Sequence, residues 1–147
     1  LIVGANSGDR DELVLRYAES DAQRVGRVLR TLGSFEAQDV ILLGGESSAD
    51  EVRRTLIGLN ARVRQNGGDA LLFVYYSGHG DAEALHLSGS RLPMRELREL
   101  LVGSPASARV LAIDGPMPTA LRAPTPFSGP HTSAKSSLQP LMTFGWS

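Results

Sequence analysis

The sequence Ala-Leu-Leu-Phe-Val-Tyr-Tyr-Ser-Gly-His-Gly, residues 70–80, constrains the architecture more than any other segment of the chain. Its apolar run over 70–76 predicts a strand that is buried on both faces. Strands of this kind lie at the centre of parallel sheets whose two faces are covered by helices. A polar, glycine-rich loop over 77–80 follows the strand, at the edge where open α/β sheets bind their ligands.

Further strands and helices are expected on both sides of this central strand. Ser20 and Ser48 are the expected N-caps of two helices, because each precedes apolar residues at helical spacing and has a partner at the capping-box position. The segment 39–43 is expected to be a second strand buried on both faces. The full expected order is strand 1–5, helix 20–32, strand 39–43, helix 48–65, strand 70–76, hairpin 83–92, helix 93–102 and strand 109–114. This alternation predicts an α/β fold, a three-layer α/β/α sandwich with a mainly parallel sheet.

Composition narrows the classes of function. The chain of 147 residues fits one domain, and its formal charge of −1 gives no reason to expect nucleic acid or an anionic membrane as a partner. No apolar run approaches the ~20 residues of a membrane span, and no signal peptide is visible, so we expect a cytoplasmic protein. The absence of cysteine excludes disulfides, thiolate metal sites and thiol catalysis within this chain. The oligomeric state stays open.

The chain divides after Asp114 into two regions of different composition. Residues 1–114 hold all 16 acidic residues, whereas residues 115–147 hold six of the 8 prolines and many Ser and Thr residues. The second region is interpreted either as a solvated, disordered extension or as translation in a shifted reading frame. The abrupt loss of acidic residues, in a chain rich in Arg and Pro, favours the shifted frame. Because the sequence also opens inside a strand, we expect the domain to be incomplete at both ends.

His79 is the candidate catalytic side chain. An imidazole at the carboxyl end of a central strand can take a proton from a nucleophile and return it to a leaving amine. The flanking Gly78 and Gly80 are expected to let the backbone turn sharply there. The alternative interpretation is a loop histidine that only makes local hydrogen bonds. A metal site built from Asp81, Glu83 and His86 is a much weaker hypothesis, so no metal or cofactor is expected.

Several segments resemble the caspase, metacaspase and bacterial caspase-like peptidases. The segment Tyr75–Gly80 is similar to the histidine loop of that family, in which an apolar strand leads into Ser-Gly-His-Gly. Residues 15–18 and 20–22 resemble the loop and the start of the first helix, and the hairpin and short helix that follow His79 match as well. The resemblance covers about residues 1–114.

The resemblance implies a cysteine endopeptidase that acts on peptides or proteins through a Cys–His dyad. His79 would then shuttle the proton, and the Gly80 N–H would be a candidate oxyanion donor. Asp114 aligns with the acid two residues before the family cysteine, which in metacaspase-like members helps to form a pocket for Arg or Lys. The alternative role for Asp114 is a cap at the strand end.

The sequence departs from the family at the nucleophile. Pro116 stands where the resemblance places the cysteine, and proline has neither a nucleophilic group nor an N–H. We therefore expect an inactive peptidase domain, or alternatively a pseudo-peptidase that binds peptides at a sheet edge. Since residues 115–147 do not resemble the later family strands, an unpaired, aggregation-prone sheet edge is also expected.

Overall fold

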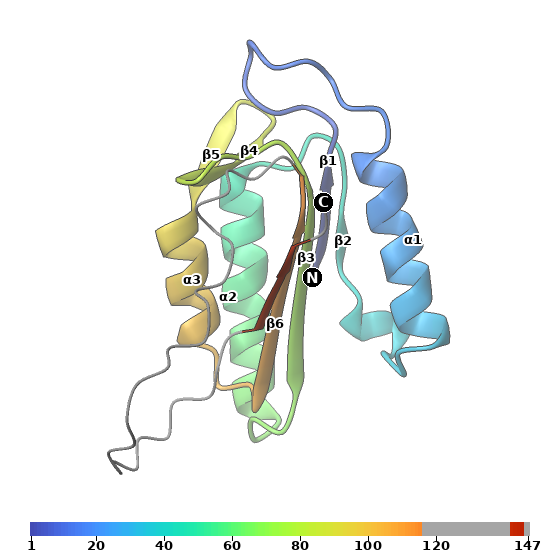
Figure 1. Cartoon of the computed structure of the whole chain (residues 1–147). Coiled ribbons are helices and arrows are strands. Elements are labelled where there is room, and N and C mark those ends of the chain that lie inside the picture. Colours follow the sequence, from blue (N-terminus) through green and yellow to red (C-terminus); the bar gives the residue numbers. More distant parts are fainter. Residues whose placement is uncertain (116–141, 146–147) are drawn as a thin grey trace, which may run out of the picture.

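In the computed structural model of the chain, residues 1–115 and 142–145 are described (Figure 1). Their main sheet is entirely parallel, in the order β2 (Leu42–Leu43), β1 (Ile2–Ala5), β3 (Leu71–Gly78), β6 (Ala108–Asp114) and β7 (Met142–Gly145). Helix α1 (Ala18–Thr31) covers one face, and α2 (Ala49–Gln65) and α3 (Met94–Val102) cover the other. The predicted α/β sandwich with a mainly parallel sheet is confirmed.

The alternation of β3 side chains explains why both faces of the sheet need helices. Tyr75 belongs to the smaller apolar cluster beneath α1, and Tyr76 belongs to the larger cluster beneath α2 and α3. Successive side chains of a strand point to opposite faces, so a central strand is apolar at every position. The largest fully buried side chains of the larger cluster are Tyr76, Leu56, Leu87, Leu92, Leu97, Leu101, Leu111 and Val3.

One of the two predicted N-caps is confirmed and the other is wrong. Ser48 caps α2, and its hydroxyl accepts a hydrogen bond from the Glu51 N–H at 3.3 Å. Ser20 lies inside α1, which begins at Ala18. The helix starts earlier because the side chain of Asn6, at the start of the loop between β1 and α1, accepts from the Glu19 N–H at 3.2 Å and satisfies a free amide of the first turn.

The strand predicted over 39–43 is shorter and more exposed than expected. Residues Ala37–Asp39 form a 3-10 helix, and only Leu42–Leu43 pair with β1. Leu42 is 43% exposed, because β2 lies at the edge of the sheet rather than inside it. The prediction of a strand buried on both faces was therefore wrong.

The predicted hairpin is confirmed, and it contacts both α2 and the loop that follows β1. It consists of β4 (Ala84–Leu87) and β5 (Ser90–Pro93), with a turn at Ser88 and Gly89, both of which adopt positive φ. The hairpin lies over the amino end of α2, where the Ser90 hydroxyl accepts from the Ala49 N–H at 2.8 Å. Its turn also donates two backbone hydrogen bonds to the loop that follows β1, from Ser88 to Ser7 and from Gly89 to Gly8.

The expectation of an unpaired sheet edge was wrong, because β7 pairs with β6 there. This strand pairs in parallel with β6, with Leu111 opposite Thr143, so a segment of the proline-rich region extends the sheet. The proposed boundary after Asp114 and the two interpretations of the tail concern mainly residues 116–141 and 146–147, which lie outside the described residues. Within the described ranges, no helix is long and apolar enough to cross a bilayer.

Candidate functional site

The site lies where β3 and β6 end side by side. Their register pairs Ser77 with Asp114, so the loop that carries His79 and the segment that follows Asp114 leave the sheet at the same edge. The two chains are in close contact there, since a Cβ added to Gly115 would lie 2.4 Å from the Gly78 carbonyl oxygen. Pro116, the position aligned with the family cysteine, lies outside the described residues.

The backbone of His79 is held by the buried hydroxyl of Tyr76. This oxygen lies 2.6 Å from the His79 carbonyl and 2.7 Å from the His86 carbonyl. A Cβ on Gly78 would lie 2.5 Å from the same hydroxyl, so only glycine fits. The backbone is extended from Gly78, the last residue of β3, to the bridge at Gly80, so the predicted sharp turn is wrong, and at Gly78 the glycine allows a close approach instead.

The imidazole of His79 is oriented by a backbone carbonyl. Its Nε2 lies 2.7 Å from the carbonyl oxygen of Leu13, and its Nδ1 lies 3.8 Å from Glu12 Oε1. Because a carbonyl oxygen can only accept, the proton of the neutral ring resides on Nε2, and Nδ1 keeps its lone pair. The local hydrogen bond and the role of a base are therefore compatible: the first fixes the tautomer that the second requires.

The backbone of Gly80 does not bond to the neighbouring strand. Hydrogen bonds from His86 to His79 and from Asp81 to Ala84, at 3.0 and 2.9 Å, flank the antiparallel bridge between Gly80 and Leu85. Gly80 is thus a non-hydrogen-bonded member of the bridge, and its N–H points away from Leu85. Within the described part of the chain, this N–H has no backbone acceptor.

Asp114 accepts a hydrogen bond from a phenol. The Tyr75 hydroxyl donates to Asp114 Oδ2 at 3.1 Å. Burial, and after it the negative charge of Asp114, raise the pKa of Tyr75 to about 12, and the charge of Asp21 adds a smaller rise. No backbone N–H of the described segments caps Asp114. Asp21, in the first turn of α1, was not among the predicted site residues, and its carboxylate is close enough to Tyr75 to act on that hydroxyl.

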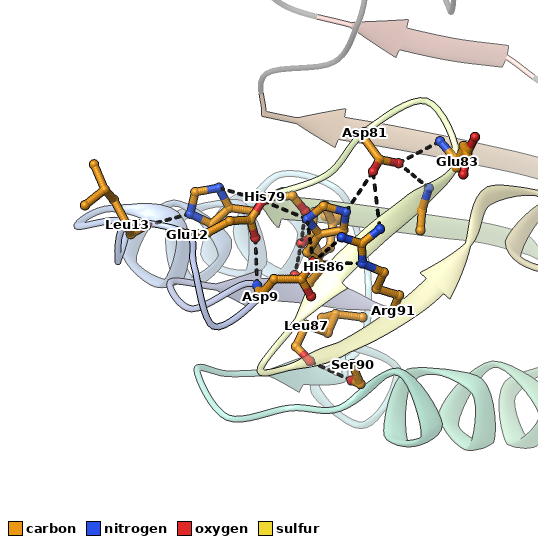
Figure 2. Close-up of polar contacts among 12 residues, drawn as sticks. Asp9, Glu12, Leu13, His79, Asp81, Glu83, His86, Leu87, Ser90 and Arg91 are labelled. Carbon is orange, nitrogen blue, oxygen red and sulfur yellow. Dashed lines mark hydrogen bonds and ion pairs between the residues drawn. The ribbon is translucent and has the colours of Figure 1, made fainter.

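A second histidine lies behind the first, in a polar cluster shown in Figure 2. The buried His86 places Nδ1 at 2.8 Å from Glu12 Oε1 and Nε2 at 3.1 Å from Asp81 Oδ2. The other Asp81 oxygen accepts from the N–H groups of Glu83 and Ala84, at 2.7 and 2.8 Å. Of the predicted metal candidates, Asp81 and His86 meet through their side chains, whereas Glu83 contributes only its backbone.

The loop between β1 and α1 supplies the other side of this cluster. Its Asp9 and Glu12 carboxylates lie close enough to His86 for a cation to be shared, with ligand atoms within 4.8 Å of one another. These atoms already have protein partners: Glu12 accepts from the Asp9 N–H, and Asp9 forms an ion pair with Arg91. The hydrogen bonds therefore account for the cluster without an ion.

Comparison with known proteins identifies the family. A family model described as "Caspase domain" matches residues 1–109. This chain belongs to the caspase domain family. Among solved structures, a chain titled "structure of pro-sf-caspase-1" aligns with a TM-score of 0.62 and 16% identity, over 92% of this chain and 52% of that chain. This likeness shows the fold, and the present chain spans about half the length of the solved one. A search of curated proteins gives no match.

Proposed function

We propose that this caspase domain carries the general-base part of a Cys–His peptidase site and is itself catalytically inactive. The observation that carries the proposal is the hydrogen bond from His79 Nε2 to Leu13, which leaves Nδ1 free to take a proton. In a complete site, Nδ1 would take the proton of a thiol and return it to the leaving amine. The outward-directed Gly80 N–H would stabilise the oxyanion.

The missing step is nucleophilic attack. Pro116 stands at the aligned position and the chain contains no cysteine, so no thioester can form. His79 alone cannot form the covalent acyl intermediate, so the peptide bond stays intact. The proposed enzyme family is therefore that of cysteine endopeptidases, with hydrolysis absent from this polypeptide.

A second candidate is a pseudo-peptidase that binds peptides without cleaving them. It is favoured by the retained Asp114, whose carboxylate lies at the sheet edge and bonds to the Tyr75 hydroxyl. With Asp21 nearby, the two negative charges would favour an Arg or Lys side chain of a bound peptide. In both candidates the ligand is an extended basic peptide of a protein.

Hydrolysis and binding are tested with the same peptides. Fluorogenic Arg and Lys peptides should be cleaved at background rate, and turnover that is abolished by His79→Ala would overturn the proposed inactivity. Binding of the uncleaved peptides is followed by chemical-shift changes of the labelled domain, with a norleucine peptide as the neutral control. Asp114→Asn should weaken the Arg peptide and leave the norleucine peptide unchanged. Equal binding of both peptides would contradict the basic preference.

The coding DNA distinguishes the two candidates. Reading all three frames across codons 114–119 tests whether another frame encodes Asp-x-Cys-x-Ser-Gly followed by strand-like sequence. Such a frame would identify the chain as a disrupted bacterial or metacaspase-like peptidase. Its absence would favour the peptide-binding module.

A further inference from the structure

We propose that Glu12 and His86 are positioning residues for His79, which hold the Leu13 carbonyl where it accepts the His79 Nε2 proton. The role of His79 rests on the proposed function, but the arrangement itself is tested without substrate or nucleophile. The contacts form a closed ring, from the His79 backbone to His86, from His86 to Glu12, and from Leu13 back to the His79 imidazole (Figure 2).

Glu12 fixes the loop immediately before the carbonyl that His79 uses. One carboxylate oxygen accepts from the Asp9 N–H at 2.7 Å, and the other lies 2.8 Å from His86 Nδ1. The side chains of Leu13 and Val14 are 87% and 70% exposed, so apolar packing does not hold this part of the loop. The position of the Leu13 carbonyl therefore depends on polar contacts on both sides of it: those of the Glu12 carboxylate, and the backbone hydrogen bond from Leu15 to Asn6 at 2.7 Å.

His86 gives Glu12 a rigid support. Its side chain is 5% exposed, its backbone N–H donates to the His79 carbonyl at 3.0 Å, and its own carbonyl accepts from Tyr76. The Nε2 contact with Asp81 holds the ring from the opposite side. One residue of the hairpin thus contacts both the His79 backbone and the loop that orients the His79 ring.

Glu12 acts on His79 through the loop and through its charge, and not through a direct hydrogen bond. Glu12 Oε1 is 3.8 Å from His79 Nδ1, which is too long for a hydrogen bond. Burial opposes ionisation of Glu12, but the hydrogen bonds from Asp9 and His86 outweigh it and hold its pKa below the usual range. Glu12 is therefore an anionic acceptor, which makes its bond to the His86 N–H charge-assisted.

The test measures hydrogen exchange of the His79 Nε2–H in the full chain labelled with ¹⁵N. In Glu12→Gln only the amide oxygen can accept a hydrogen bond, so one of the two contacts of the Glu12 carboxylate is lost. We expect this variant to accelerate exchange of the His79 Nε2–H about tenfold. His86→Gln should have the same effect. Amide exchange in β3 reports global unfolding and should not change, which separates positioning from a general loss of stability. Glu83→Gln is the matched control, because in the described structure the Glu83 carboxylate has no hydrogen-bond partner.

Unchanged His79 Nε2–H exchange in folded Glu12→Gln and His86→Gln would overturn the proposal. If neither variant folds, the unmodified chain supplies the decisive measurement. The ring of contacts requires that one loop opening exposes both the His79 Nε2–H and the His86 Nδ1–H, so the two exchange rates, each divided by the intrinsic rate of its ring position, should give the same opening free energy. Different opening free energies would contradict the proposal. A chain that binds no peptide but shows the expected exchange would refute the proposed function alone.

Discussion

At the scale of single residues, the hydroxyl of Tyr76 and the bare backbone of Gly78 occupy one tightly filled space. A Cβ at Gly78 would lie 2.5 Å from the Tyr76 oxygen and 3.0 Å from the Ala5 carbonyl. We expect Gly78→Ala to lower the free energy of unfolding by ~1–3 kcal/mol, the usual range for overpacking. Urea denaturation measures the change.

A double-mutant cycle tests the cause of this loss. Tyr76→Leu removes both the hydroxyl oxygen and the ring carbon Cζ, which would lie 2.5 and 2.7 Å from the added Cβ, so Gly78→Ala should be less harmful in that background than in the native chain. The control is Gly58→Ala in α2, where the added Cβ has nothing within 4 Å, and which should gain roughly 0.5–1 kcal/mol from helix propensity. Strict additivity of the Tyr76 and Gly78 changes would contradict the steric explanation.

Asp81 makes stability depend on acid pH. Hydrogen bonds from the Glu83 and Ala84 N–H groups, the largest cause, hold its pKa below the ordinary value. Its ionised form therefore stabilises the fold above the unfolded-state pKa of ~3.9, and this contribution is lost as pH falls through the lower folded-state value. We expect Asp81→Asn to flatten the decline of unfolding free energy from pH 4 downward, measured by urea denaturation. Parallel declines in both proteins would refute this assignment.

At the scale of elements, Arg53 joins α2 to α3. Its guanidinium contacts both carboxylate oxygens of Glu96, with Nη2 at 2.8 Å from Oε2. The neighbouring Arg95–Glu99 pair lies within α3 and is largely exposed. Glu99→Gln should therefore cost only ~0.3–0.5 kcal/mol, as i,i+4 pairs usually do. Glu96→Gln should cost more, because the bidentate pair holds two helices together. Equal shifts of the urea midpoint in the two variants would show that the interhelical pair stabilises the fold no more than the exposed pair does.

Elements were predictable from sequence where their contacts are local. Ser48 was recognised as a cap because the N–H that donates to its hydroxyl belongs to Glu51, three residues along in the same helix. Ser20 was not a cap, because Asn6, 13 residues before Glu19 at the start of the β1–α1 loop, satisfies the first turn of α1. The apolar run at 39–43 predicted a strand, but composition alone does not distinguish an edge strand such as β2 from a central one.

The same limit applies to the candidate site. His79 stands in a recognisable local pattern, Ser-Gly-His-Gly after a buried strand. Its acceptor, the Leu13 carbonyl, lies 66 residues away in sequence. Every residue has a backbone carbonyl, so the residue type at position 13 does not indicate this contact. The contact between Glu12 and His86 could not be predicted, because only the folded loop and hairpin bring the two residues together.

At the scale of the whole molecule, the sheet ends in two edges of different kinds. On one side β2 is a strand of 2 residues, too short to template extensive pairing. On the other side β6, which has 7 residues, is covered by β7. Sequence composition had indicated an open edge there, since the strand belongs to a proline-rich region without acidic residues.

Removal of the β7 pairing should therefore make the domain self-associate. The variant replaces residues 142–145 with a Gly-Ser segment of equal length, which keeps the chain length but weakens strand formation. Sedimentation velocity is measured over a range of protein concentrations. The sedimentation coefficient of the variant should rise with concentration more than that of the unmodified chain, because the exposed β6 edge offers unpaired N–H and C=O groups to a second copy. The same replacement at residues 33–36, in the exposed connection after α1, is the control for chain flexibility and leaves the β6 edge covered. If the β7 variant sediments like the unmodified chain, β7 does not protect the edge, and β6 is kept from pairing with another copy by other means.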